Sequence, residues 1–307
     1  MNKPDLGKLI GTMPNETGLR QRARFHQGWW RAFVLNEPEG LNPADAEKRV
    51  CNTIMDDEKS GSNFLTPEAI QAIDQTKLER EAFEAGLFNE DRLFNNLLSS
   101  QPLAFNFFGP LKQNLVFAKS ILELRLPGIS KVSNIFFEFA PREKYSGDNS
   151  AFDVAIEIEM GSLKGLVGLE CKYTDTFSAK EYSKDSYRRI FEASTSFKQP
   201  YEAYIASRFN QLFRGQLIAE ALVQNKKYDF CMNGLFCHHL DTDAIETGLE
   251  FRKMMFGGDE GFRIITYSEF ISDVQKLDLS WERREWSMML WARYCGHRLS
   301  DGVFGTT

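Results

Sequence analysis

Hydrophobic and polar positions alternate most clearly in the middle of the chain. Val132–Ala140 is rich in residues that favour strands, Phe152–Met160 (FDVAIEIEM) alternates cleanly, and Gly165–Tyr173 follows after a short Gly-Ser connection. A period of two is typical of a strand with one buried face. Because short links join antiparallel neighbours, the pattern predicts a three-stranded antiparallel meander over residues 131–173.

Helical patterns precede and follow this meander. Helices are expected at Leu19–Leu35, from Thr66-Pro67 onward, and at Gln113–Leu124, Tyr201–Val223 and Trp281–Tyr294. The apolar segment 96–111 is expected to be interrupted near its end by Gly109-Pro110. Two further strands are expected at Tyr228–Cys237 and Gly261–Tyr267.

These elements predict an α/β (or α+β) fold: a mixed central sheet with an antiparallel hairpin, flanked by helices. We expect a helical N-terminal extension over residues 1–95, a core over 96–275, and a C-terminal helix within 276–307 packed on that core. Up to about residue 100 the chain shows only helical and loop patterns.

Composition indicates the class of protein and its expected location. The 307 residues are 42% hydrophobic and 26% charged, as in soluble globular proteins, and no apolar run approaches the roughly 20 residues that span a bilayer. The five cysteines are irregularly spaced and the first residues lack the apolar core of a signal peptide, so the expected location is the cytoplasm. No membrane association is expected.

Charge is unevenly distributed around a net value of −6. Residues 1–34 hold six Lys or Arg against two acids, residues 35–95 hold fourteen acids against six bases, and residues 172–229 hold ten bases against seven acids. An acidic total can therefore contain locally basic surfaces that attract nucleic acid.

The alternation also predicts a group of polar side chains on one face of the sheet. Phe152, Val154, Ile156 and Ile158 point one way, and Asp153 points the other. In the next strand Glu170 and Lys172 share a face, so two antiparallel neighbours bring Asp153, Glu170 and Lys172 together. Glu138 can join them from the first strand.

This group has the chemistry of a hydrolytic metal site. Carboxylate oxygens are the ligands that Mg²⁺ prefers, and a cation held by them activates water and offsets charge on a phosphate. A nearby ammonium can orient the attacking water. The plainer interpretation is a solvated polar face with ordinary cross-strand charge pairs. A glycosidase also uses paired carboxylates, but its mechanism gives no reason for a Lys two residues beyond the Glu.

Longer motifs around these residues resemble a known superfamily. The runs FFEFAPREKYSGDNSAFDVAIEIE (136–159) and GLECKYTD (168–175) resemble the PD-(D/E)XK, or restriction-endonuclease-like, nuclease superfamily, and within it a bacterial branch known mainly as hypothetical proteins. The segments SSQPLAFNFF (99–108) and QLFR (211–214) match that branch before and after the core. The resemblance covers residues 95–240; Ala151-Phe152 stands where the superfamily has a nominal Pro.

The resemblance implies a metal-dependent nuclease. It gives Glu138, Asp153 and Glu170 the role of holding Mg²⁺ or Mn²⁺ and assigns Lys172 to the attacking water, with Asp148 as a weaker candidate. DNA is favoured over RNA. The alternative is a non-catalytic nucleic-acid-binding or scaffold protein that keeps the fold, although such a protein would be expected to lose the Lys or one of the acids.

Other candidate nucleic-acid contacts come from a glutamine and from basic residues. Gln211 and Arg214 lie one helical turn apart on the same face of a predicted helix. One interpretation is that they contact a phosphate, and the other is that they form a surface pair on an amphipathic helix. Arg20 and Arg24 belong to a segment that also contains Trp29 and Trp30. One interpretation is that these arginines neutralise a nucleic-acid backbone, and the other is that they are simply solvated. A second copy of the chain, and a protein bound by the acidic segment 35–95, remain open as partners.

Overall fold

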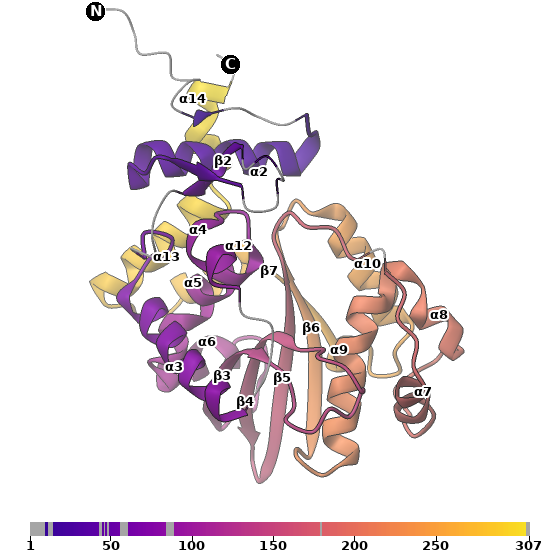
Figure 1. Ribbon diagram of the computed structural model, residues 1–307. Coiled ribbons are helices and arrows are strands. Elements are labelled where there is room, and N and C mark those ends of the chain that lie inside the picture. Colours follow the sequence, from indigo (N-terminus) through magenta and orange to yellow (C-terminus); the bar gives the residue numbers. More distant parts are fainter. Residues whose placement is uncertain are drawn as a thin grey trace, which may run out of the picture.

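A five-stranded mixed sheet forms the centre of the computed structural model (Figure 1). The structure describes residues 10–11, 15–42, 45, 47, 49–55, 61–83, 89–178 and 180–304, and of residues 80–83 the backbone alone. The strands in spatial order are β3 (Lys131–Phe139), β4 (Phe152–Met160), β5 (Leu163–Lys172), β6 (Phe230–Cys237) and β7 (Phe262–Thr266).

Pairing in this sheet changes direction at β5. Strands β3, β4 and β5 pair antiparallel, whereas β5 with β6 and β6 with β7 pair parallel. The long connection from β5 to β6 contains helices, as parallel pairing requires. The predicted meander, the two later strands and the mixed sheet are confirmed.

Helices cover both faces of the sheet and continue beyond it. Those before the sheet are α2 (Gly18–Trp29), the π-helix η1 (Trp30–Leu35), α3 (Pro67–Phe83), α4 (Glu90–Asn95), α5 (Ser100–Lys112) and α6 (Leu115–Glu123). Those after β5 are α7 (Asp185–Glu192), α8 (Tyr201–Ile205), α9 (Ser207–Gln224), α10 (Thr242–Lys253), α11 (Gly258–Gly261), α12 (Tyr267–Gln275), α13 (Trp281–Tyr294), the 3-10 helix η2 (His297–Ser300) and α14 (Asp301–Phe304).

The two faces of β4 pack against different helical layers. Helices α5 and α6 lie on one side of the sheet, and α9 and α10 lie on the other (Figure 1). Val154, Ile156 and Ile158 join the core on the α5 side. Ala155 instead joins a cluster that α9 completes with Ile218 and Leu222. The period-two pattern thus sorts these residues as expected.

Phe152 is an exception to the predicted face. It packs with Ala155 and Leu166 in the cluster on the α9 side, not with Val154. The reason is a missing side chain in β5, because a Cβ on Gly168 would lie 2.4 Å from the Phe152 ring. The space left by that glycine accepts the ring.

Helix α5 corrects a second expectation. It runs through Gly109 and Pro110 to Lys112 without the predicted interruption. Gly109 faces α3, where an added Cβ would lie 2.7 Å from the Ala69 Cα, so the glycine permits close contact between the two helices. Packing of this buried helix outweighs the hydrogen bond that Pro110 cannot donate.

The N-terminal region contains a strand pair that the sequence patterns did not indicate. Strands β1 (Glu39–Leu41) and β2 (Val50–Met55) form a separate antiparallel sheet beside α2 (Figure 1). The expected helix at 201–223 is divided at Ala206, whose ψ of 140° ends α8. The proposed division of the chain at residues 95 and 275 remains a prediction. Among the helices of the described ranges, none has the length and apolar character needed to cross a membrane.

Candidate active site

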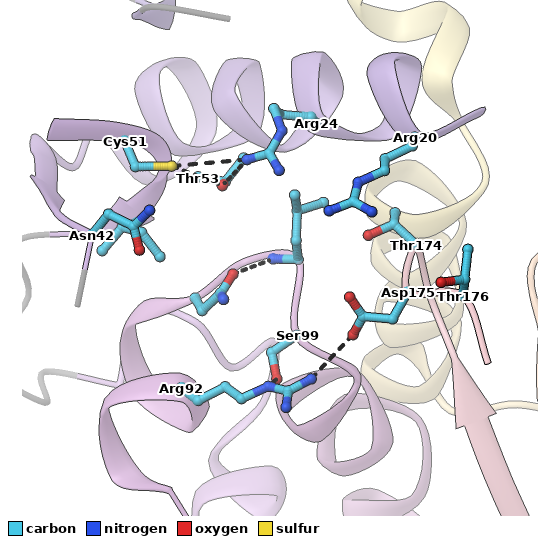
Figure 2. A pocket seen from close by; sticks show the side chains of 13 residues that line it. Arg20, Arg24, Asn42, Cys51, Thr53, Arg92, Ser99, Thr174, Asp175 and Thr176 are labelled. Carbon is cyan, nitrogen blue, oxygen red and sulfur yellow. Dashed lines mark hydrogen bonds and ion pairs between the residues drawn. The ribbon is translucent and has the colours of Figure 1, made fainter. Parts of the chain in front are cut away.

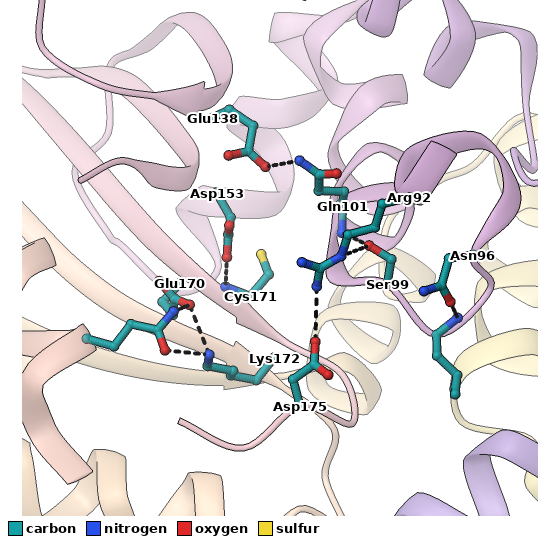
Figure 3. Close-up of polar contacts among 12 residues, drawn as sticks. Arg92, Asn96, Ser99, Gln101, Glu138, Asp153, Glu170, Cys171, Lys172 and Asp175 are labelled. Atoms are coloured by element: carbon teal, nitrogen blue, oxygen red, sulfur yellow. Dashed lines mark hydrogen bonds and ion pairs between the residues drawn. The ribbon is translucent and has the colours of Figure 1, made fainter. Parts of the chain in front are cut away.

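Three carboxylates lie in one row across neighbouring strands. Phe137 pairs with Val154 and Phe139 with Phe152, which places Glu138 of β3 opposite Asp153 of β4. Val154 pairs with Leu169, so the next residues along, Asp153 and Glu170, are also neighbours. Figure 3 shows the row passing from Glu138 to Asp153 and on to Glu170.

The backbone and a neighbouring helix hold the first two carboxylates. The amide of Cys171 donates to Asp153 Oδ2 at 2.6 Å, and Gln101 Nε2 of α5 donates to Glu138 Oε1 at 2.8 Å. Glu138 has a φ of 50°, in the left-handed region that glycine favours. Such a conformation costs on the order of 1–3 kcal/mol in a non-glycine residue and often marks a functional position.

Lys172 is fixed beside the third carboxylate. Its Nζ lies 3.2 Å from Glu170 Oε1 and donates to Gln211 Oε1 at 2.7 Å. The amide of Gln211 in turn donates to Glu170 Oε1 at 2.5 Å. The Tyr267 hydroxyl donates to the Lys172 backbone carbonyl, and only 6% of Lys172 is exposed. The ammonium group therefore has little freedom to leave the row.

The electrostatics of the row favour a bound cation. Burial raises the pKa of Asp153 well above its ordinary value, and the charges of Glu170 and Glu138 raise it further. The Cys171 amide and Lys172 act in the opposite direction but do not offset these effects. One ammonium among three carboxylates leaves an excess of negative charge that a divalent cation would neutralise.

A comparison with models of protein families identifies the family of the chain that carries this arrangement. The family model described as the PD-(D/E)XK nuclease superfamily matches residues 14–296. The chain belongs to the PD-(D/E)XK nuclease superfamily. The family expected from the motifs is thereby confirmed. No curated protein and no solved structure matches the chain in the corresponding searches.

The residues of this PD-(D/E)XK member fit the divalent metals that such nucleases typically use. Oδ1 of Asp153 and Oε2 of Glu170 accept no hydrogen bond from any described residue, so each carboxylate keeps a ligand atom available. Oxygen donors of this kind suit Mg²⁺ or Mn²⁺. In the described ranges no three His, Cys, Asp or Glu side chains already have a metal-holding arrangement. A cation bound by three of these side chains would therefore require them to turn from their present orientations.

The other predicted candidates near the row have separate contacts. Arg214 of α9 lies over the Tyr182 ring at 4.9 Å, and its buried Nε has no hydrogen-bond partner among the described residues. Asp148 accepts hydrogen bonds from the Tyr187 hydroxyl and from Ser146. Burial raises the pKa of Asp148, but these hydrogen bonds outweigh it and the pKa is lowered overall. Through these contacts Asp148 joins its turn to α7, and among the described residues it has no hydrogen bond or ion pair with the row.

Arg20 and Arg24 lie outside the row but are close to each other. Both bind the carboxylate of Glu16, at 2.8 Å from Arg20 and 2.6 Å from Arg24. They line a cavity that Arg92 also enters from another side (Figure 2). The structure thus brings the two candidates together with an arginine that the sequence patterns did not single out.

Two residues of the site escaped prediction. Gln101 falls within the SSQ motif at 99–101, but no role was assigned to it, and Arg92 lies in the acidic segment 35–95. The position of Gln101 two residues after the helix-capping Ser99 is a pattern that could have indicated it, since it places the amide in the first turn of α5.

Proposed function

We propose that the chain is a metal-dependent nuclease that hydrolyses phosphodiester bonds, with DNA as the favoured substrate. The observation that supports this most is the row of Glu138, Asp153 and Glu170 beside a buried Lys172. Membership of the superfamily implies a nucleic-acid substrate. Localisation in the cytoplasm remains an expectation.

Each side chain of the row has a distinct task. Asp153 and Glu170 would hold the cation through their available oxygens, and Glu138 would complete the carboxylate set from β3. Bound Mg²⁺ or Mn²⁺ supplies Lewis-acid chemistry, lowering the pKa of a water and offsetting the charge that grows on the phosphate.

Lys172 and Gln211 act on the substrate side of the row. The Lys172 ammonium orients the attacking water and stabilises negative charge on the phosphate oxygens. Gln211 bridges Lys172 and Glu170 and so fixes the distance between the ammonium and the carboxylate. The arrangement is suited to attack by water on a phosphate bound at the row.

Cleavage of labelled DNA and RNA, in single-stranded and duplex forms, tests the proposal. We expect DNA to be cut in Mg²⁺ or Mn²⁺ and to remain intact when EDTA is in excess. If the protein binds these substrates but cuts none of them, the alternative of a non-catalytic nucleic-acid-binding protein is favoured. Cleavage that persists in EDTA would exclude the metal-dependent mechanism.

A further inference from the structure

A polar cavity of about 480 Å³ adjoins the row of carboxylates. Its walls come from α2, from β2, from α4 and the segment joining it to α5, and from the loop that follows β5 (Figure 2). Small-ligand sites commonly have volumes of roughly 300–1,000 Å³, so the cavity can accept a group as large as a nucleotide. We call it the arginine pocket, after Arg20, Arg24 and Arg92.

Positive charge dominates the lining of the arginine pocket. Three guanidinium groups face one carboxylate, that of Asp175, and most of the remaining lining is amide or hydroxyl. Arg92 and Asp175 lie 3.1 Å apart, but their side chains are 45% and 48% exposed, so their attraction is weak and a phosphate can replace it. Glu16 offsets only one of the two charges that Arg20 and Arg24 bring.

The lining also indicates which part of a nucleotide would bind. Arg presents a planar fork of donors that matches phosphate oxygens, and Ser99 and Thr174 add hydroxyl groups. No aromatic side chain belongs to the lining among the described residues, so the pocket offers no surface on which a base can stack. This chemistry suits recognition of a sugar-phosphate unit without reading its base.

Two short chain segments connect the pocket to the row. Lys172 belongs to the row, and Thr174, two residues later, lines the pocket. Ser99 lines the pocket, and Gln101, two residues later, holds Glu138. Figure 3 shows the contact between Arg92 and Asp175 beside this group. A nucleic-acid strand bound at the carboxylates would therefore pass close to the arginine pocket.

We propose that the arginine pocket binds a phosphate of the substrate strand next to the bond that is cut. This inference rests on the proposed nuclease function and adds a sequence-independent contact to it. The phosphate belongs either to a strand end or to an internal phosphodiester, and the chemistry of the pocket is the same for both.

Binding measured in EDTA tests the pocket separately from cleavage. The probes are one fluorescent single-stranded oligodeoxynucleotide with a 5′-phosphate and the same oligonucleotide with a 5′-hydroxyl, followed by anisotropy. We expect Arg20→Gln/Arg92→Gln to bind roughly 10–100-fold more weakly than wild type, and the slope of log affinity against log salt to fall by about 1 for each phosphate that the variant no longer binds. Weakening confined to the phosphorylated probe identifies a terminal phosphate, whereas equal weakening for both probes identifies an internal one.

The matched control is Arg284→Gln, an exposed arginine of α13 outside the pocket lining. It removes one positive charge, as the single variant Arg20→Gln does, and is expected to bind like wild type. The single variant Arg20→Gln serves if the double variant does not fold, because the Arg20 side chain is 49% exposed. Binding by the pocket variants that equals that of Arg284→Gln would overturn the proposal, even if the wild type cuts DNA. Pocket-dependent binding without any cleavage would instead contradict the proposed nuclease function alone.

Discussion

The two ends of strand β4 carry acids on the same face, but the charges around these acids differ between the two ends. At one end, Glu157 forms an ion pair with Lys164 at 2.8 Å, and Glu159 accepts from Lys131 at 2.9 Å. At the other end, Asp153 adjoins two more carboxylates, and the one ammonium of the row contacts Glu170. Hydrogen bonds from Lys131 and Ser133 lower the pKa of Glu159, whereas burial and like charges raise that of Asp153.

The difference separates acids whose charge is offset within the fold from acids whose charge is not. The charge of a paired acid such as Glu159 is offset by its lysine, so the acid needs no further partner. Asp153 lies in an arrangement that costs stability unless something positive joins it, and perturbed carboxylates of this kind are concentrated at functional sites. Substitutions at the two ends of the same strand can therefore be compared directly.

The largest expected effect is on Lys172. Lys172→Ala removes the ammonium beside the row and should reduce cleavage roughly 10²–10⁴-fold, the range for loss of a positioned proton-handling group. The matched change is Lys164→Ala, whose lysine pairs with Glu157 at the other end. It should leave the rate within about twofold of wild type, since such surface pairs contribute little. Equal losses in both variants, measured as single-turnover rates, would remove the distinction between the two ends.

Metal binding should give the next largest effect. Divalent cations should stabilise the wild-type protein by about 2.7 kcal/mol at one hundred times the dissociation constant. Asp153→Asn should lose most of that gain, because it removes a central ligand from the row. Thermal denaturation with and without Mn²⁺ provides the measurement. A stabilisation that Asp153→Asn retains would place the cation elsewhere.

Gln211→Ala is expected to have an intermediate effect. It removes the bridge between Lys172 and Glu170, and loss of such a supporting partner typically costs roughly 10–100-fold in activity or metal affinity. Gln224→Ala, at an exposed position on the same helix, is the control. If the cleavage rate of Gln211→Ala matches that of the control, the bridge has no functional role.

The smallest expected effect is on stability without metal. Asp153→Asn should stabilise the protein in EDTA by about 1 kcal/mol at neutral pH, because it relieves like-charge repulsion. The raised pKa of Asp153 means that the wild type loses stability as the pH rises from about 4 through that pKa, and the variant should lack this loss. Denaturant melts across this pH range give the comparison, and destabilisation of Asp153→Asn would contradict it.

The strands of the site could be predicted from the sequence because their information is local. Alternation over Phe152–Met160 sorted most side chains to the correct face, and strand phase placed Asp153 near Glu170. Phe152 escaped this reasoning, since its position depends on the space beside Gly168 of the neighbouring strand. Helix α5 escaped for a similar reason, because packing against α3 holds it straight through a proline.

Contacts between distant segments could not be predicted. Gln101 reaches Glu138 across 37 residues of sequence, and Arg92 reaches Asp175 across 83. Neither pairing leaves a periodic pattern, because each depends on how α4 and α5 pack against the sheet. The arginine pocket has the same origin, since α2, β2 and the loop after β5 come together only in the folded chain.

The most direct test of the carboxylate row as the catalytic centre compares Asp153→Asn with Glu159→Gln in one cleavage assay. Both changes remove one carboxylate charge from the same face of β4, and both proteins would be assayed on labelled DNA in Mn²⁺ beside the wild type and an EDTA control. We predict that Glu159→Gln cuts like the wild type, whereas Asp153→Asn and the EDTA sample cut nothing measurable. Equal cleavage by the two variants would show that the row of carboxylates is not the catalytic centre.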